Sequence, residues 1–226
     1  MKKKNAILIL EAPWELSESD QNTVSVLPFF QGLERLRGNF DLFHSHFYEA
    51  KSFEMALDNL TRVQYDRCYV YIACHGAGKR LHNMNMANAL KIIQTKAKQN
   101  NILGVVIGSC LVGNNTDIMG ESMKNSPIVW KFGYRCEVNW LDGTLMDLEV
   151  FDALLKAREP DFSDENALLH RFQSAFRHYA PHAIIGNHPN GEGCSIADGI
   201  SLVIQARGQG HVPMDYSECL FNDNCE

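Results

Sequence analysis

The sequence predicts a single α/β domain, built on a mostly parallel sheet of six strands with helices on both faces. Short apolar runs alternate with segments whose apolar residues recur every three or four positions, the pattern of alternating strands and helices. One strand–helix–strand unit is complete within about forty residues, which is typical of a right-handed crossover between parallel neighbours. No repeat, low-complexity tract or linker divides the 226 residues, so we expect residues 1–226 to form one domain.

The first part of the chain predicts two strands and two helices. A continuous apolar run indicates a strand that is covered on both faces, and an alternating run further on indicates a strand near the sheet edge. Pro28 lies inside a helical stripe, so the first helix is expected to begin there. Ser52 is the expected N-cap of the second helix. The expected strands are residues 6–10 and 41–48, and the expected helices are 28–37 and 53–60.

The clearest unit lies in the middle of the chain. A β-branched and aromatic strand, 68–73, is followed by a helix, 83–99, and by a second apolar strand, 102–107. Residues 111–127 are rich in Gly, Asn, Ser and Asp, and are expected to form a mobile loop. The remaining expected elements are strands at 128–132, 183–186 and 201–206, and helices at 146–156 and 165–179.

Composition excludes several classes of protein. The chain is 45% apolar and 21% charged with a net charge of −6, so it has no basic surface for nucleic acid or an anionic membrane. The apolar run near the N-terminus is too short for a signal peptide, and no run is long enough for a membrane span. The seven cysteines form no CxxC pair, and an odd count argues against a secreted disulfide framework. We therefore expect a cytoplasmic protein.

Two chemically active side chains follow neighbouring strands. His75 comes two residues after the strand at 68–73, and Cys110 comes three residues after the strand at 102–107. Adjacent parallel strands lie about 4.8 Å apart, so both side chains are expected at one edge of the sheet, where ligands bind in such folds. A thiol beside an imidazole forms a nucleophile and its base. The backbone amides of Gly76 and Cys110 are candidates for an oxyanion hole.

Both strand ends resemble those of a known group of enzymes. Tyr69-Val-Tyr-Ile-Ala-Cys-His-Gly76 and Val105-Val-Ile-Gly-Ser-Cys110 resemble the His and Cys segments of caspase-fold (clan CD) cysteine peptidases. Residues 139–155 are similar to the helix after the fifth strand in the bacterial CHAT (caspase-like) branch. The resemblance covers residues 6–156, and residues 157–226 are expected to complete the sheet.

The sequence also departs from particular families of that group. The spacing from His75 to Cys110 is shorter than the roughly 50 residues typical of caspases, and the Gln-Ala-Cys-Arg-Gly signature is absent. Gly108 stands where metacaspases have an acidic residue. Strict cleavage after aspartate, or after basic residues by the metacaspase route, is therefore not predicted.

The resemblance implies a cysteine endopeptidase that needs no metal or organic cofactor and cleaves a protein substrate. It further implies an extended substrate that pairs with residues 133–139, and an activating partner or sensor complex in antiviral defence or cell death. The positive charge of Arg135 would favour an acidic residue before the cleaved bond, and nearby carboxylates would oppose that preference. Because Gly108 is small and uncharged, an uncharged or basic residue is favoured there. The expected substrate-binding residues are Gly108, Tyr134, Arg135, Cys136 and Glu137.

Several alternatives remain open at this level. The chain could be a non-catalytic caspase-fold interaction module, although a pure scaffold has no physical need for both His75 and Cys110. Cys74 is expected to be a buried strand residue rather than the nucleophile. His44 and His46 share a strand face without evident partners and are expected to be solvated. A zinc site could draw on residues of the C-terminal part, but their spacing matches no known pattern: His188, Cys194, His211, Cys219 and Cys225.

Overall fold

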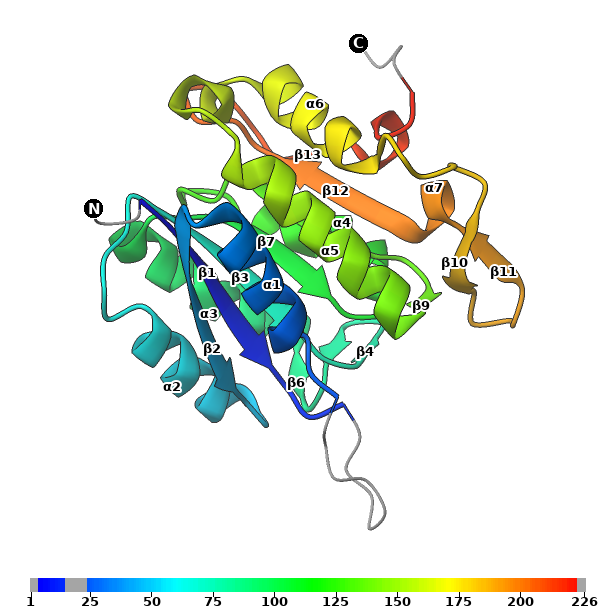
Figure 1. The fold of residues 1–226 in the computed structure, drawn as a ribbon, viewed down its shortest axis with the longest axis horizontal. Coiled ribbons are helices and arrows are strands. Elements are labelled where there is room, and N and C mark those ends of the chain that lie inside the picture. Colours follow the sequence, from blue (N-terminus) through cyan, green and yellow to red (C-terminus); the bar gives the residue numbers. More distant parts are fainter. Residues whose placement is uncertain (1–3, 15–23, 223–226) are drawn as a thin grey trace.

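A seven-stranded sheet forms the centre of the computed structural model, which describes residues 4–14 and 24–222 (Figure 1). In spatial order the strands are β13, β12, β8, β7, β3, β1 and β2. The pairings from β2 to β8 are parallel, whereas β12 pairs antiparallel with both β8 and β13. The strands are β1 (Asn5–Glu11), β2 (Phe40–His46), β3 (Arg67–Ala73), β7 (Ile102–Gly108), β8 (Trp130–Tyr134), β12 (Ile200–Ile204) and β13 (Met214–Asp215).

Helices cover both faces of this sheet because its central strands are apolar on both sides. In β1, Ile7 and Ile9 pack into one buried cluster, and Leu8 and Leu10 pack into the other. The first cluster lies under α1 (Leu27–Arg37), α5 (Trp140–Leu155) and α6 (Glu165–Phe176), and the second under α2 (Ala50–Leu60), α3 (Met86–Asn100) and α4 (Thr116–Glu121). None of the helices in the described part of the chain has the length and apolarity that crossing a membrane requires.

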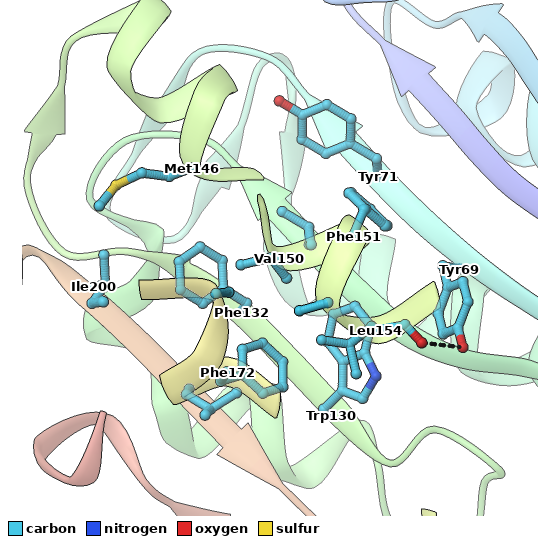
Figure 2. Packing of buried hydrophobic residues seen from close by; sticks show 14 of the residues in the cluster. Tyr69, Tyr71, Trp130, Phe132, Met146, Val150, Phe151, Leu154, Phe172 and Ile200 are labelled. Carbon is cyan, nitrogen blue, oxygen red and sulfur yellow. Dashed lines mark hydrogen bonds between the residues drawn. The ribbon is translucent and has the colours of Figure 1, made fainter. Parts of the chain in front are cut away.

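Aromatic side chains dominate the first cluster (Figure 2). Trp130 on β8 stacks on Tyr69 with ring centroids 5.8 Å apart, and meets Phe172 of α6 edge-on at 5.4 Å. Gly104 on β7 leaves the space that the Trp130 indole occupies, because a Cβ atom there would overlap the ring. This packing fixes α6 against the sheet.

Short elements complete the fold. One three-stranded sheet contains β4 (Gly76–Ala77), β5 (Arg80–Leu81) and β6 (Met84–Asn85), and another contains β9 (Glu137–Val138), β10 (Ile184–Asn187) and β11 (Gly193–Ser195). The remaining helical turns are η1 (Val112–Asn114), η2 (Glu159–Ser163), α7 (Ile196–Gly199) and η3 (Ser217–Cys219).

Most predicted elements are confirmed, and the exceptions have physical causes. The predicted strand at 183–186 forms β10, but β10 pairs with β9 and β11 instead of entering the main sheet. Residues 111–127 contain η1 and α4 rather than a continuous loop, because Met119 and Met123 are buried in the second cluster. Ser52 is not the N-cap of α2. Glu49 is, and its carboxylate accepts the Ser52 N–H at 2.8 Å while the Ser52 hydroxyl bonds back to the Glu49 N–H at 3.0 Å.

Candidate active site

His75 and Cys110 occupy equivalent places on adjacent parallel strands. Ala73 of β3 is the register partner of Gly108 of β7. His75 follows Ala73 by two positions, and Cys110 follows Gly108 by two positions. Both side chains line one cavity of about 80 Å³ at the carboxyl ends of the strands. The expected juxtaposition of an imidazole and a thiol at this edge is therefore present.

The backbone around Cys110 is shaped by two unusual residues. Gly76 lies so close to the cysteine turn that a Cβ atom there would be 2.9 Å from Ser109 Cβ and 3.0 Å from the Cys110 nitrogen. Leu111 adopts a left-handed conformation with φ of 65°, which is uncommon for a residue with a side chain. Its N–H donates to the Cys136 carbonyl at 3.1 Å. These contacts hold the turn that carries Cys110 between Gly76, which follows β3, and Cys136, which follows β8.

The backbone carbonyl of Trp14 orients the imidazole of His75. Nε2 of His75 is hydrogen-bonded to this carbonyl oxygen. Because a carbonyl only accepts, Nε2 carries the proton, and Nδ1 is left as the basic nitrogen. The Trp14 indole meets the His75 ring edge-on at 5.4 Å, and its Nε1 donates to Glu11 at 2.8 Å. The segment directly after β1 thus positions the candidate base.

Cys110 rests as a neutral thiol. Its Sγ donates to the Val138 carbonyl at 3.8 Å. Burial raises the pKa of Cys110 and the charge of Glu137 adds to that rise, while the Val138 contact acts in the opposite direction. Because a thiol is a weak nucleophile, this residue needs a base such as His75 to become reactive.

Cys74 has the surroundings of a structural residue. It is fully buried, and its Sγ shares a hydrogen bond of 3.2 Å with the Ser109 hydroxyl. Burial raises the pKa of Cys74 to about 12, which suppresses the thiolate. These surroundings agree with the expected role of Cys74 as a buried strand residue.

The far wall of the cavity holds a buried acid that sequence reasoning missed. Asp147 of α5 is 1% exposed, and Tyr71 and Tyr134 each donate a hydrogen bond of 2.7 Å to its carboxylate. Burial raises the pKa of Asp147 to about 7, against the lowering effect of the two tyrosine bonds. A signal was present in the sequence, since Asp147 interrupts the apolar face that α5 presents with Val150, Phe151 and Leu154.

The expected substrate-binding residues lie in different places. Gly108 and Tyr134 line the cavity, whereas Arg135, Cys136 and Glu137 do not. Arg135 forms an ion pair with Asp215 at 3.3 Å, and Cys136 is fully buried. Glu137 is exposed on β9. Val138, within the segment expected to pair with the substrate, also lines the cavity, and residues not anticipated from the sequence complete its wall: Trp14, Trp140, Gly143 and Thr144.

The strand β9 offers a free edge beside Cys110. Among the described residues, Glu137 and Val138 pair with β10 on one side only, because β9 is the outer strand of its sheet. The Asn139 N–H donates to the carbonyl of Ile185 in β10, so by alternation the polar backbone groups of Val138 face the other way. The contact of the Val138 carbonyl with the Cys110 thiol agrees with that direction. An extended peptide could therefore add to β9 and pass the cysteine.

One group of possible metal ligands lies outside the cavity. The ligand atoms of Glu11, His44 and His46 are within 4.8 Å of one another, the one such group among the described residues. The expectation that the histidines have no close partner is therefore wrong, since His44 Nε2 lies 2.8 Å from the Glu11 carboxylate. The structure gathers no metal-ligating group from the described candidates of the C-terminal part, and Cys225 lies outside the described residues.

No protein-family description and no curated protein sequence matches this chain. Among solved structures, it is similar to a secreted C11 cysteine protease from Bacteroides thetaiotaomicron in complex with an irreversible peptide inhibitor, with a TM-score of 0.54 and 8% identity over 90% of this chain. This chain spans 66% of that protein. A comparison with the complex of Porphyromonas gingivalis RgpB pro- and mature domains gives a TM-score of 0.47 and 10% identity over 94% of this chain and 68% of that one. The first likeness shows a shared fold, the caspase-like α/β fold.

Proposed function

We propose that this chain is a cysteine endopeptidase in which Cys110 is the nucleophile and His75 is the base. The observation that carries the proposal is their juxtaposition. Two equivalent strand ends bring a thiol and an oriented imidazole into one cavity, beside a strand edge that is open to an extended peptide. The caspase-like fold shared with a C11 cysteine protease supports the same reading.

The reaction follows from the proton positions at rest. His75 Nδ1 takes the proton of the Cys110 thiol, and the thiolate attacks the carbonyl carbon of the scissile bond. The imidazolium keeps its Nε2 proton on the Trp14 carbonyl, which stabilises the positive charge. The backbone N–H groups of Gly76 and Cys110 are the proposed donors to the oxyanion.

The second half of the reaction uses the same groups. His75 returns its Nδ1 proton to the leaving amine as the C–N bond breaks, which leaves a thioester on Cys110. A water molecule then attacks the thioester, with His75 as its base, and releases the new carboxyl terminus and the thiol.

We extend this proposal to the biological setting through the sequence resemblance. Residues 139–155, similar to the CHAT branch, support a peptidase that acts on one or a few partner proteins and is controlled by an activating partner or sensor complex. The odd count of seven cysteines, with no CxxC pair among them, supports a cytoplasmic enzyme. Antiviral defence or programmed cell death is the setting that this branch suggests.

The test is covalent labelling with peptidyl acyloxymethyl ketones that carry lysine, leucine or aspartate next to the reactive group. We expect labelling of the wild-type protein at Cys110 and none of Cys110→Ala, with slower labelling of His75→Ala. Cys74→Ala is the matched control and should label like the wild type. Circular dichroism verifies that each variant is folded.

Two results would contradict the proposal. Undiminished labelling of Cys110→Ala would place the nucleophile elsewhere. A folded wild-type protein that none of the three probes labels would favour the interaction module, whose partner binding would not depend on Cys110.

A further inference from the structure

Two histidines and a glutamate converge at the carboxyl ends of β1 and β2. In the parallel pairing of these strands, Glu11 is the register partner of His46, and His44 precedes His46 by two positions. Side chains at these places point to one face of the sheet, the face where Ile9 packs into the buried cluster under α1. The ligand atoms of Glu11, His44 and His46 lie within 4.8 Å of one another. Three donors from two fixed strands therefore meet around one point.

The carboxylate of Glu11 is held with one oxygen towards the histidines. It is 1% exposed, and its Oε1 accepts hydrogen bonds from the Trp14 indole at 2.8 Å and the Val26 N–H at 2.9 Å. Its Oε2 lies 2.8 Å from His44 Nε2 and accepts from the Ser25 hydroxyl at 2.7 Å. Carboxylates that bind metal ions are commonly fixed by such hydrogen bonds. Because each carboxylate oxygen has two lone pairs, Oε2 can keep the Ser25 bond and still bind an ion.

The distances suit an ion between these atoms. Zinc binds imidazole nitrogen and carboxylate oxygen at about 2.0–2.2 Å, so two ligand atoms of a tetrahedral zinc ion lie about 3.3 Å apart. Glu11 Oε2 and His44 Nε2 are 2.8 Å apart, and the rings of His44 and His46 meet edge-on with centroids 4.7 Å apart. Movements of about 1 Å at each side chain make room for the ion, which replaces the proton between Glu11 and His44.

The group is open to solvent on one side. In the order of the described strands, β2 is the last of the seven-stranded sheet (Figure 1). At its end His46 is exposed, whereas His44 is half-buried. An ion can therefore enter from water, and a water molecule can serve as the fourth ligand.

The donor types favour zinc over the other common divalent ions. Two imidazoles and one carboxylate, with the fourth position left to water, form a ligand set that zinc takes in proteins. Calcium and magnesium prefer oxygen ligands, and this group supplies two nitrogens for its one carboxylate.

We propose that Glu11, His44 and His46 bind one zinc ion, outside the cavity of the candidate dyad. The zinc ion stabilises the end of β1, because it holds the carboxylate that accepts from the Trp14 indole. The Trp14 carbonyl in turn bonds to His75, so zinc supports the segment that orients this imidazole. The site does not depend on the proposed peptidase function, and it stands or fails by metal binding alone.

The first experiment is a calorimetric titration of zinc into Cys110→Ala, because the thiol and imidazole of the dyad are themselves zinc ligands. We expect one ion per chain. Adding His44→Gln or His46→Gln to this variant should weaken zinc binding by about 100-fold or more, since loss of a group that only supports a ligand already costs 10–100-fold. Adding His170→Gln is the matched control and should change nothing, because His170 is an exposed histidine of α6 outside the group.

Two further measurements separate a coordinated ion from loose association. Cobalt absorbs visible light strongly in a tetrahedral site and weakly in an octahedral one, so Co²⁺ should colour Cys110→Ala but not Cys110→Ala/His46→Gln. Zinc should also raise the urea midpoint of Cys110→Ala and leave that of Cys110→Ala/His46→Gln unchanged, because an ion bound only to the folded state stabilises it. Circular dichroism verifies that each variant is folded without metal.

Three results would overturn the inference. One is the absence of zinc binding to Cys110→Ala, which would leave Glu11 and His44 as an ordinary hydrogen-bonded pair. Another is equal zinc affinity in the His46→Gln and His170→Gln variants, which would place the ion elsewhere. The third is tighter binding of calcium or magnesium than of zinc.

Discussion

Replacement of Glu11 by glutamine tests the network that holds Trp14 against His75. The Glu11 carboxylate lies at the end of β1 and is 1% exposed. It accepts hydrogen bonds from the Trp14 indole at 2.8 Å, the Val26 N–H at 2.9 Å and the Ser25 hydroxyl at 2.7 Å, and it contacts His44 at 2.8 Å. Burial acts to raise the pKa of Glu11, but these hydrogen bonds outweigh it and lower the pKa.

The size of the effect follows from which bonds glutamine can keep. Trp14 and Val26 donate to one oxygen of Glu11, and Ser25 and His44 contact the other. The amide oxygen of glutamine can accept the hydrogen bonds from Trp14 and Val26. The new NH₂ group then faces Ser25 and His44, whose hydroxyl can rotate and whose imidazole can change its tautomer to accept from it. The two retained bonds lose their charge assistance, at about 1 kcal/mol each, so Glu11→Gln should lower the free energy of unfolding by about 2 kcal/mol.

Alanine at the same position removes every acceptor. The Val26 N–H and the Trp14 indole N–H would then lack partners, at about 1–3 kcal/mol each. Glu11→Ala should therefore cost about 4 kcal/mol, twice the effect of glutamine. Glu11→Ala should also slow labelling of Cys110, by about tenfold or more, because Trp14 loses the bond that keeps its carbonyl on His75, whereas Glu11→Gln keeps that bond and should slow labelling much less.

Urea unfolding at pH 7 measures these differences, and Glu54→Gln is the control because Glu54 forms only an exposed pair with Lys51. For a chain of this length, 2 kcal/mol corresponds to roughly 4–8 °C in Tm. A group with a lowered folded pKa stabilises the fold above its ordinary pKa of 4.5 and loses that effect as pH falls through the folded value. The gap between wild type and Glu11→Gln should thus narrow in acid. A Glu11→Gln protein as stable as the control, or equal effects of glutamine and alanine, would refute the reasoning.

Two other positions give independent tests. Gly76→Ala should reduce kcat/KM by about 100-fold, because the new Cβ pushes the Cys110 turn away. Gly32→Ala, whose Cβ meets nothing within 4 Å, should keep full activity, and equal activities of the two variants would contradict the close approach. Lys131 is fully buried, and burial lowers its pKa well below 10.5, so the destabilisation that Lys131 causes should shrink from neutral pH towards 10.5, where the unfolded chain also loses its proton. Chemical unfolding between pH 7 and 10 should show that the stability of the wild type rises relative to that of Lys131→Met, and parallel profiles would rule this out.

The sequence alone was sufficient for the architecture and for the central pair of residues. Apolar periodicity reports how each local segment is buried, so the strands β1, β3 and β7 and the helices between them follow from the pattern. His75 and Cys110 each come directly after such a strand. Because parallel neighbours end at the same edge, local positions were enough to predict that the two residues share a site.

Only the tertiary structure decided which more distant groups complete the site. Asp147 is bonded to Tyr134 of the preceding strand and to Tyr71 of β3, which lies 76 residues earlier in the sequence, and Trp14 reaches His75 from the end of β1. Whether β10 joins the main sheet depends on its partners β9 and β11. These outcomes depend on how separate elements pack against one another. A local pattern of apolar and polar residues encodes which face of an element is buried, and it does not encode which partner that face will meet.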